Sequence, residues 1–182
     1  MIWTRRPIFR RVVAGVAVIA ACLTAVPANA AAAGSSRTPP PVAAVSWNAL
    51  VNVHSGSCLD VKYADPNPGA EVILWPCHGG QNQLWAYFPD GSIRNQLNEG
   101  LCLDIAYADQ SNGARLIMWP CNGQSNQGWL WEYFNYPYAQ FRTDLNNKCL
   151  DGDLYHADHV QVWECLWDEW RKPQRNQLWK WE

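Results

Sequence analysis

Charged side chains are scarce in this sequence. Asp, Glu, Lys and Arg make up 16% of the 182 residues, below the roughly 25% usual in soluble globular proteins. Four Arg and no acidic residue lie in the first 30 positions, so the remainder carries 10 basic and 16 acidic side chains. A domain with this balance has no basic surface to neutralise phosphates, and we expect no nucleic-acid partner.

Motifs for catalysis and metal binding are also missing. The cysteines include no C-x2-C pair of the kind that binds zinc, and no G-x-S-x-G nucleophile motif occurs. Asp151-Gly152-Asp153 lacks the further ligands of a calcium loop. We therefore expect no metal, no cofactor and no catalytic residue. Beyond position 46, no stretch of ten residues has the 3.6-residue apolar period of a helix, so helix content should be near zero.

The longest apolar run, Val12 to Val26, has fifteen residues, which is short for a membrane-spanning helix of about 20. A basic head precedes it, and the small-residue site Ala28-Asn29-Ala30 follows. This order predicts a signal peptide over 1–30, a secreted protein, and no stable membrane insertion after cleavage. The alternative is a lipid anchor at Cys22, because Ile19-Ala20-Ala21-Cys22 is similar to a lipobox.

Residues 31–46 are small and rich in Ala and Pro, which is typical of a linker. A folded domain, which we expect to be monomeric, should occupy 47–182.

A four-part pattern occurs three times in that domain. The triplet Cys-Leu-Asp is followed by a Trp two residues before a second Cys, and then by Asn-Gln-x-Trp. The period is 44 residues from the first copy to the second and 47 from the second to the third. Three such copies predict three structural repeats over about 47–93, 94–141 and 142–182.

Removing Cys22 with the signal peptide leaves six cysteines, for which fifteen pairings exist. Equivalent repeats should make equivalent bonds, which selects one pairing within each repeat. Each disulfide should contribute about 3 kcal/mol by restricting the unfolded chain. The predicted pairs are Cys58–Cys77, Cys102–Cys121 and Cys149–Cys165.

Short apolar segments separated by Gly, Pro, Asn and Asp turns predict four strands in each repeat. In the first repeat they are Val51–Val53, Cys58–Val61, Glu71–Trp75 and Gln83–Phe88. One such unit cannot bury its own apolar face, but three around an axis share a core. The predicted fold is all-β: a β-trefoil of three four-stranded repeats with pseudo-threefold symmetry.

The triple CLD…WPC…NQxW pattern resembles the ricin B-chain lectin family, which includes the family 13 carbohydrate-binding modules. The resemblance covers roughly 47–182, with the third copy reading WEC in place of WPC. It implies a secreted, non-catalytic lectin that binds galactose-like or xylan-type glycans at several sites.

The resemblance also implies which residues bind sugar. A Trp would stack on the apolar face of the sugar ring, while Asp, Asn and His would hydrogen-bond its hydroxyls. The implied sets are Asp60, Ile73, Trp75, His78 and Asn82; Asp104, Ile117, Trp119, Asn122 and Asn126; and Asp151, Gln161, Trp163 and Asn176.

The third set departs from the pattern. Leu166 stands where His78 and Asn122 stand in the other repeats, and six extra residues, 167–172, follow it. Trp167 and Trp170 in this insertion either extend a glycan-contacting wall or cover the core.

Other aromatic and histidine positions have plainer interpretations. The Trp of each Q-x-W is expected in the core, with its Gln hydrogen-bonded to backbone. Tyr63 and Tyr107 fit packing or ligand contact equally well. The remaining histidines, His54, His156 and His159, are expected to be solvated surface residues.

Glycoside hydrolysis needs two carboxylates facing one sugar, and each implied site supplies one, so we expect no enzyme. Replacing Asp60 by Ala is expected to abolish binding in the first repeat without affecting the fold. The alternative function is protein–protein contact, as in an enzyme inhibitor or a toxin subunit, with the 167–172 insertion as the working surface.

Overall fold

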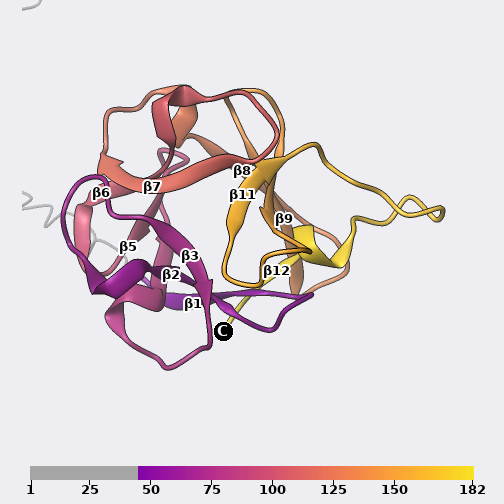
Figure 1. The fold of residues 1–182 in the computed structure, drawn as a ribbon, viewed down its shortest axis with the longest axis horizontal. Helices are drawn as coiled ribbons and strands as arrows, with labels where there is room; N and C mark the ends of the chain where they lie inside the picture. Colours follow the sequence, from indigo (N-terminus) through magenta and orange to yellow (C-terminus); the bar gives the residue numbers. More distant parts are fainter. Residues whose placement is uncertain (1–44) are drawn as a thin grey trace, which may run out of the picture. The chain divides into compact units, whose positions relative to one another are not determined.

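The computed structural model describes residues 45–182, in which we find twelve strands and no α-helix (Figure 1). The all-β prediction is therefore confirmed. In this part of the chain, no helix is long and apolar enough to cross a membrane. The predicted signal peptide, the Cys22 anchor and most of the linker lie outside the described residues.

The strands follow the three sequence repeats in order. They are β1 (Asn48–Asn52), β2 (Cys58–Val61), β3 (Val72–Trp75), β4 (Leu84–Tyr87), β5 (Ile93–Asn95), β6 (Asn98–Ile105), β7 (Ala114–Pro120), β8 (Trp129–Tyr133), β9 (Tyr138–Thr143), β10 (Cys149–Gly152), β11 (Val160–Trp163) and β12 (Trp179–Trp181).

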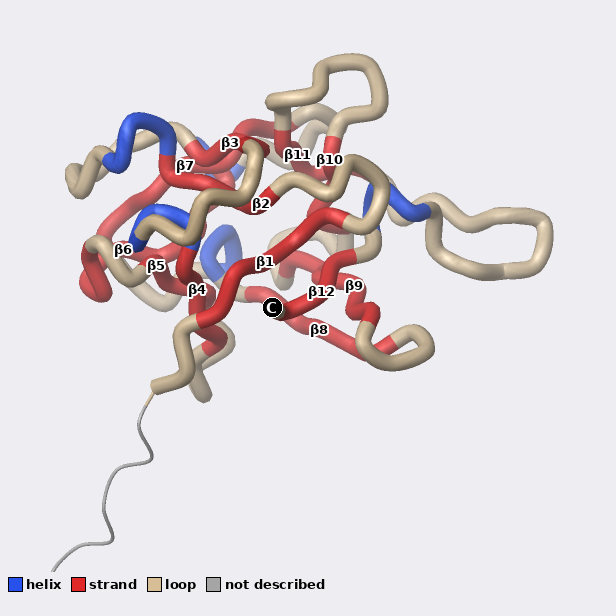
Figure 2. Tube along the Cα trace, turned by 90° about the horizontal axis from the view of Figure 1, so that it is seen from below, coloured by secondary structure: helices blue, strands red, loops and turns tan. Residues whose placement is uncertain are grey.

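The first and fourth strands of the repeats pair with one another, and the middle two strands of each repeat form a hairpin. β1 pairs with β4 and β12, β5 pairs with β4, and β9 pairs with β8 and β12. The C-terminal strand therefore lies beside the first one (Figure 2). The hairpins are β2–β3, β6–β7 and β10–β11.

Backbone hydrogen bonds join the three hairpins in a cycle. The Met118 N–H donates to the Ala70 carbonyl at 2.9 Å, the Gly113 N–H to Val162 at 2.9 Å, and the Leu74 N–H to Asp158 at 2.9 Å. Each hairpin thus donates a backbone hydrogen bond to the hairpin of another repeat, and these bonds join the three repeats into one fold.

The Q-x-W tryptophans form the centre of the core, as predicted. Each is fully buried, and its indole N–H donates to the carbonyl of the Leu in the Cys-Leu-Asp triplet of the same repeat, at 2.8–3.0 Å. This bond satisfies the only polar atom of a large buried side chain. The pairs are Trp85–Leu59, Trp129–Leu103 and Trp179–Leu150.

All three predicted disulfides are present: Cys58–Cys77, Cys102–Cys121 and Cys149–Cys165. Each joins the first strand of a hairpin to the chain just beyond its second strand: Cys58 and Cys149 begin β2 and β10, and Cys102 lies within β6.

Five single turns of 3-10 helix were not predicted. Three of them, η2 (Gln81–Gln83), η4 (Ser125–Gln127) and η5 (Arg175–Gln177), hold the Asn-Gln pair of each repeat. The fourth strand of the first repeat consequently begins at Leu84, one residue later than predicted. The other two, η1 (Lys62–Ala64) and η3 (Ala106–Ala108), directly follow β2 and β6.

Candidate functional site

Strand alternation places an acid and an indole on one face of each hairpin, with an aliphatic side chain opposite the acid in the first two repeats and Gln161 there in the third. In the first repeat, Asp60 lies opposite Ile73, and Cys58 lies opposite Trp75. Residues two apart on a strand share a face, so Asp60 and Trp75 point to the same side while Leu59 points to the core. The same register pairs Asp104 with Ile117, and Asp151 with Gln161.

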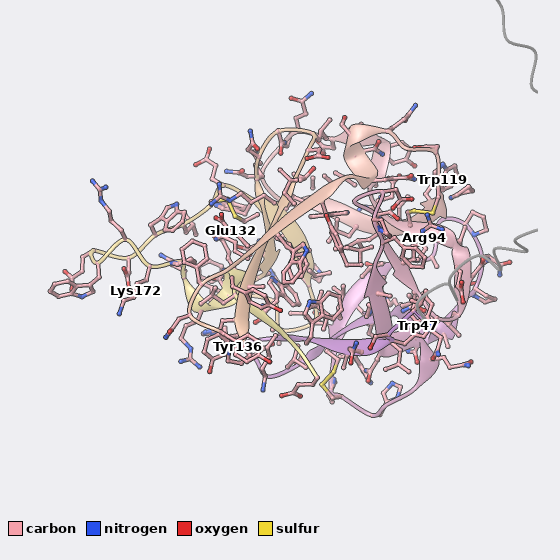
Figure 3. All side chains as sticks on the ribbon, turned by 180° about the vertical axis from the view of Figure 1, so that it is seen from behind. Trp47, Arg94, Trp119, Glu132, Tyr136 and Lys172 are labelled. Carbon is pink, nitrogen blue, oxygen red and sulfur yellow. A yellow bond between two sulfur atoms is a disulfide. The ribbon has the colours of Figure 1, made fainter. Side chains whose placement is uncertain are left out.

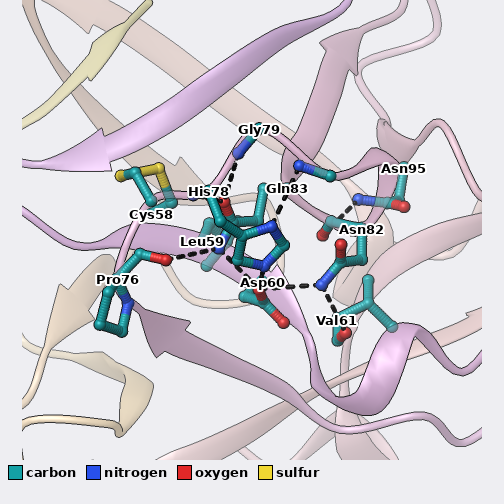
Figure 4. Close-up of polar contacts among 12 residues, drawn as sticks. Cys58, Leu59, Asp60, Val61, Pro76, His78, Gly79, Asn82, Gln83 and Asn95 are labelled. Atoms are coloured by element: carbon teal, nitrogen blue, oxygen red, sulfur yellow. Dashed lines mark hydrogen bonds and ion pairs between the residues drawn. A yellow bond between two sulfur atoms is a disulfide. The ribbon is translucent and has the colours of Figure 1, made fainter.

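Each of these aspartates is buried and held by the Asn-Gln pair of its own repeat. Asp60 Oδ2 accepts hydrogen bonds from Asn82 Nδ2 at 2.9 Å and Gln83 Nε2 at 2.7 Å (Figure 4). The same two bonds recur at 2.7–3.0 Å on Asp104 and Asp151. The 3-10 turn therefore aims two amides at one carboxylate oxygen and fixes its position.

The Gln of each pair also holds the turn, as predicted. Gln83 Oε1 accepts the His78 N–H at 2.8 Å, while its Nε2 donates to the Pro76 carbonyl at 3.1 Å. Equivalent bonds involve Gln127 and Gln177.

The second carboxylate oxygen distinguishes the third repeat from the first two. Among the described residues, no side chain or backbone group donates to Oδ1 of Asp60 or Asp104. Asp151 Oδ1, in contrast, accepts a hydrogen bond from Gln161 Nε2 at 3.2 Å. In the first two sites, Oδ1 of the buried aspartate can therefore accept a hydrogen bond from a sugar hydroxyl. In the third site, the corresponding oxygen already accepts one from Gln161.

Burial raises the pKa of all three aspartates, although the Asn and Gln hydrogen bonds oppose that shift. The effect is largest for Asp151, whose pKa rises to about 6. A nearby Asp153 contributes to that rise by charge repulsion.

The tryptophans at the ends of the hairpins are exposed, whereas the Q-x-W tryptophans are buried. Trp75 is 50% exposed and Trp119 is 44% exposed, and Trp119 lies at the surface in Figure 3. Trp163 is partly exposed. An exposed indole on a rigid hairpin provides an apolar platform beside the aspartate.

His78 and Asn122 occupy equivalent places just after the second cysteine. Each accepts a backbone N–H two residues further on, from Gly80 and Gln124 respectively. His78 Nε2 also lies 3.5 Å from Asp60 Oδ2, so its imidazole faces the site.

The second repeat carries a hollow of about 650 Å³ around these residues. Asp104, Ile117, Trp119, Asn122 and Asn126, the whole set implied by the sequence, line it. The same hollow has walls that the sequence analysis did not assign to a site: Gly69, Glu71, Ala106, Tyr107, Ala108, Arg115 and Gln124. Gly69 and Glu71 belong to the first repeat, which only the fold brings to this place.

The third repeat also carries a hollow, of about 440 Å³, which is lined by Asp151, Gln161, Trp163 and Asn176 together with Leu166. The inserted Trp167 and Trp170 are not among its walls. Trp167 packs instead against Phe134, with ring centroids 5.5 Å apart. The rest of the insertion extends away from the strands, as the position of Lys172 shows (Figure 3).

Tyr63 and Tyr107 do not pack, because they are 91% and 93% exposed. Both have left-handed backbone angles, with φ of 60° and 59°, a conformation that costs a residue other than Gly about 1–2 kcal/mol. Tyr107 lines the hollow of the second repeat together with Trp119. A strained, exposed aromatic at a pocket rim points to ligand contact rather than to stability.

Comparison with known proteins agrees with this geometry. The profile of the ricin-type beta-trefoil lectin domain matches residues 46–179. The chain belongs to this family. Beta-galactoside-specific lectin 2 of Viscum album is 44% identical over 43 residues, which are 22% of this chain and 8% of that protein. Volkensin of Adenia volkensii is 42% identical over 50 residues, 26% of this chain and 10% of that one. The lectin domain thus matches only a small part of each relative.

Solved structures share the fold. The designed threefold-symmetric protein ThreeFoil is 29% identical with a TM-score of 0.63, covering 74% of this chain and 96% of its own. The hemolytic lectin CEL-III is 28% identical with a TM-score of 0.63, covering 75% and 30%. An exo-beta-1,3-galactanase from Clostridium thermocellum is 25% identical with a TM-score of 0.68, covering 77% and 30%. The predicted β-trefoil is confirmed.

Proposed function

We propose that this lectin domain is a secreted, non-catalytic protein that binds glycans at more than one site. The observation that carries the proposal is the exposed tryptophan beside a buried aspartate with one free oxygen, repeated in the first two units. The indole stacks on the apolar face of a pyranose, and the carboxylate accepts a charge-assisted hydrogen bond from a hydroxyl.

The ligands we propose are galactose-like or xylan-type glycans. The name of the Viscum album relative, a beta-galactoside-specific lectin, supports the first class. In the second repeat, Tyr107 gives the sugar a second aromatic wall, and Gln124 and Arg115 add donors at the rim of the hollow.

Secretion fits the three disulfides, which persist in oxidising surroundings. A binding role fits the carboxylates of the two hollows. Hydrolysis of a glycosidic bond needs two carboxyl groups about 5–9.5 Å apart on either side of the sugar. The hollow of the second repeat holds Glu71 as well as Asp104, but Glu71 is paired with Lys62 at 2.6 Å. The hollow of the third repeat holds Asp153 as well as Asp151, and Asp153 Oδ2 lies 2.8 Å from His156 Nδ1.

A glycan array tests the proposal. The wild-type protein should bind a defined group of glycans that share a terminal or backbone sugar. The double variant Trp75→Ala/Trp119→Ala should lose those signals. Trp170→Ala is the matched control, because Trp170 is 74% exposed yet lines neither hollow. Binding that persists in the double variant but disappears with Trp170→Ala would instead identify the 167–172 insertion as the interaction surface.

A further inference from the structure

The loop between β10 and β11 gathers two histidines and an aspartate at the surface. The ligand atoms of Asp153, His156 and His159 all lie within 4.8 Å of one another. His156 Nδ1 is 2.8 Å from Asp153 Oδ2, and the rings of His156 and His159 stack with centroids 5.0 Å apart. The spacing D-x2-H-x2-H that produces this cluster occurs only in the third repeat.

Backbone hydrogen bonds hold the loop in this shape. The Asp153 N–H donates to the His159 carbonyl at 3.0 Å, and the His159 N–H to the His156 carbonyl at 3.0 Å. The Tyr155 N–H donates to Asp153 Oδ1 at 2.8 Å and orients the carboxylate. The Asp158 carbonyl accepts the Leu74 N–H of β3, which fastens the loop to the first repeat. The three side chains therefore converge on a supported backbone.

From this convergence we propose that Asp153, His156 and His159 form a binding site for a divalent transition metal, with Zn²⁺ as the natural occupant. Two imidazole nitrogens and one carboxylate oxygen suit zinc better than they suit Ca²⁺ or Mg²⁺, which prefer oxygen ligands.

Little movement is needed to complete the coordination. Zinc bonds of about 2.0–2.1 Å in a tetrahedron bring ligand atoms to about 3.4 Å from one another. Both imidazoles are exposed, so they can rotate by the remaining distance without disturbing the core. Three protein ligands leave a fourth position for water or another ligand.

The site adjoins the hollow of the third repeat, because Asp153 and Tyr155 line it. A bound ion would fix this wall of the hollow. This consequence, unlike the metal site itself, rests on the proposed glycan-binding function.

Isothermal titration of the tag-free protein with ZnCl2 tests the site directly. The wild-type protein should bind one Zn²⁺, and the double variant His156→Ala/His159→Ala should bind at least about a hundredfold more weakly, since two of three ligands are gone. His54→Ala is the matched control: it removes an exposed histidine of the first repeat and should bind as the wild type does.

Absence of 1:1 zinc binding in the wild type, or unchanged binding in the double variant, would overturn the proposal. Cobalt substitution gives a second readout, because a site with these ligands should show the visible absorption of tetrahedral Co²⁺ only when both histidines are present. Neither measurement uses a glycan, so a failed glycan array and a failed metal titration are separate results.

Discussion

At the scale of single residues, the buried aspartates belong to the fold as well as to the ligand site. Asp60 accepts two hydrogen bonds from the amides of Asn82 and Gln83, which are themselves buried. Each amide nitrogen also donates to a backbone carbonyl, Asn82 to Val61 and Gln83 to Pro76. Removing the carboxylate would therefore leave one N–H of each amide without an acceptor, and each such group costs about 1–3 kcal/mol. The expectation from sequence that Asp60→Ala spares the fold is therefore revised by the structure.

We predict that Asp60→Ala lowers the free energy of unfolding by about 2 kcal/mol or more, whereas Asp60→Asn lowers it by less. The amide oxygen of Asn can still accept from Asn82 and Gln83, but it lacks the negative charge. In a background where Trp119 and Trp163 are already Ala, both variants should lose sugar binding. Denaturant unfolding and sugar titration check the two halves of the prediction. Equal stability of Asp60→Ala and wild type would contradict it.

The titration of Asp151 should affect stability and sugar binding in opposite directions as the pH falls. Its pKa of about 6 in the folded protein lies above the ordinary 3.8, so the folded state binds the proton more tightly than the unfolded chain. Stability should therefore rise as the pH falls through 6 towards 4. Between pH 7 and pH 5 the gain is about 1 kcal/mol. Any binding in the third repeat should weaken over the same range, because a protonated carboxyl loses its charge-assisted bond.

The variant Asp151→Asn isolates this effect. The free energy of unfolding of wild type and variant is measured with denaturant at pH 7 and at pH 5. The difference between the two proteins at each pH removes the contributions of the other carboxylates. A difference that does not change with pH would show that Asp151 titrates like an exposed residue.

At the scale of elements, η3 places Tyr107 in a left-handed turn in the wall of the second repeat's hollow. Glycine adopts a positive φ without steric cost, although it loses more backbone entropy on folding. We predict that Tyr107→Gly leaves the free energy of unfolding within about 1 kcal/mol of wild type. Glycan binding in the second repeat should weaken by about tenfold, the loss of one aromatic contact.

Thermal unfolding and titration with Trp75 and Trp163 already replaced by Ala check this prediction. A large loss of stability would show that Tyr107 packs, and unchanged binding would remove it from the site.

The hairpin strands and the disulfides were predictable because repetition and alternation encode them locally, whereas the first strand spans Asn48–Asn52 and not the predicted Val51–Val53. Cys-Leu-Asp places Leu59 inward and Asp60 outward by strand period alone, and equivalence of the repeats selected the cysteine pairs. The single 3-10 turns were not predictable, since three residues show no period. Gly69 and Glu71 reach the hollow of the second repeat from a neighbouring repeat, and the convergence of His156 with Asp153 depends on how their loop closes. The spacing of residues along the chain predicts neither of these two arrangements.

At the scale of the whole domain, the proposed sites are held on one rigid scaffold. The cyclic hydrogen bonds between hairpins leave no hinge between the first repeat and the second. When a polysaccharide spans two sites, the second contact becomes intramolecular, and avidity exceeds the single-site affinity by about 10²–10⁴-fold. A polymer should therefore bind far more tightly than its monosaccharide.

The structure supports a ranking of the sites within this arrangement. Gln161 occupies the second oxygen of Asp151, and Leu166 replaces the polar side chain that follows the second cysteine elsewhere. The first two repeats should then contribute most of the polymer affinity, and Trp163→Ala alone should remove little of it.

Titration of one polysaccharide chosen from the glycan array, against wild type, Trp75→Ala/Trp119→Ala, Trp163→Ala and Trp170→Ala, tests the central claim most directly. The account predicts near-complete loss of polymer binding in the double variant, a small loss with Trp163→Ala, and none with Trp170→Ala. Thermal unfolding of all four proteins should be similar, because the replaced indoles are exposed or partly exposed. Polymer binding by the double variant equal to that of wild type would contradict the claim that the hairpin tryptophans form the glycan sites.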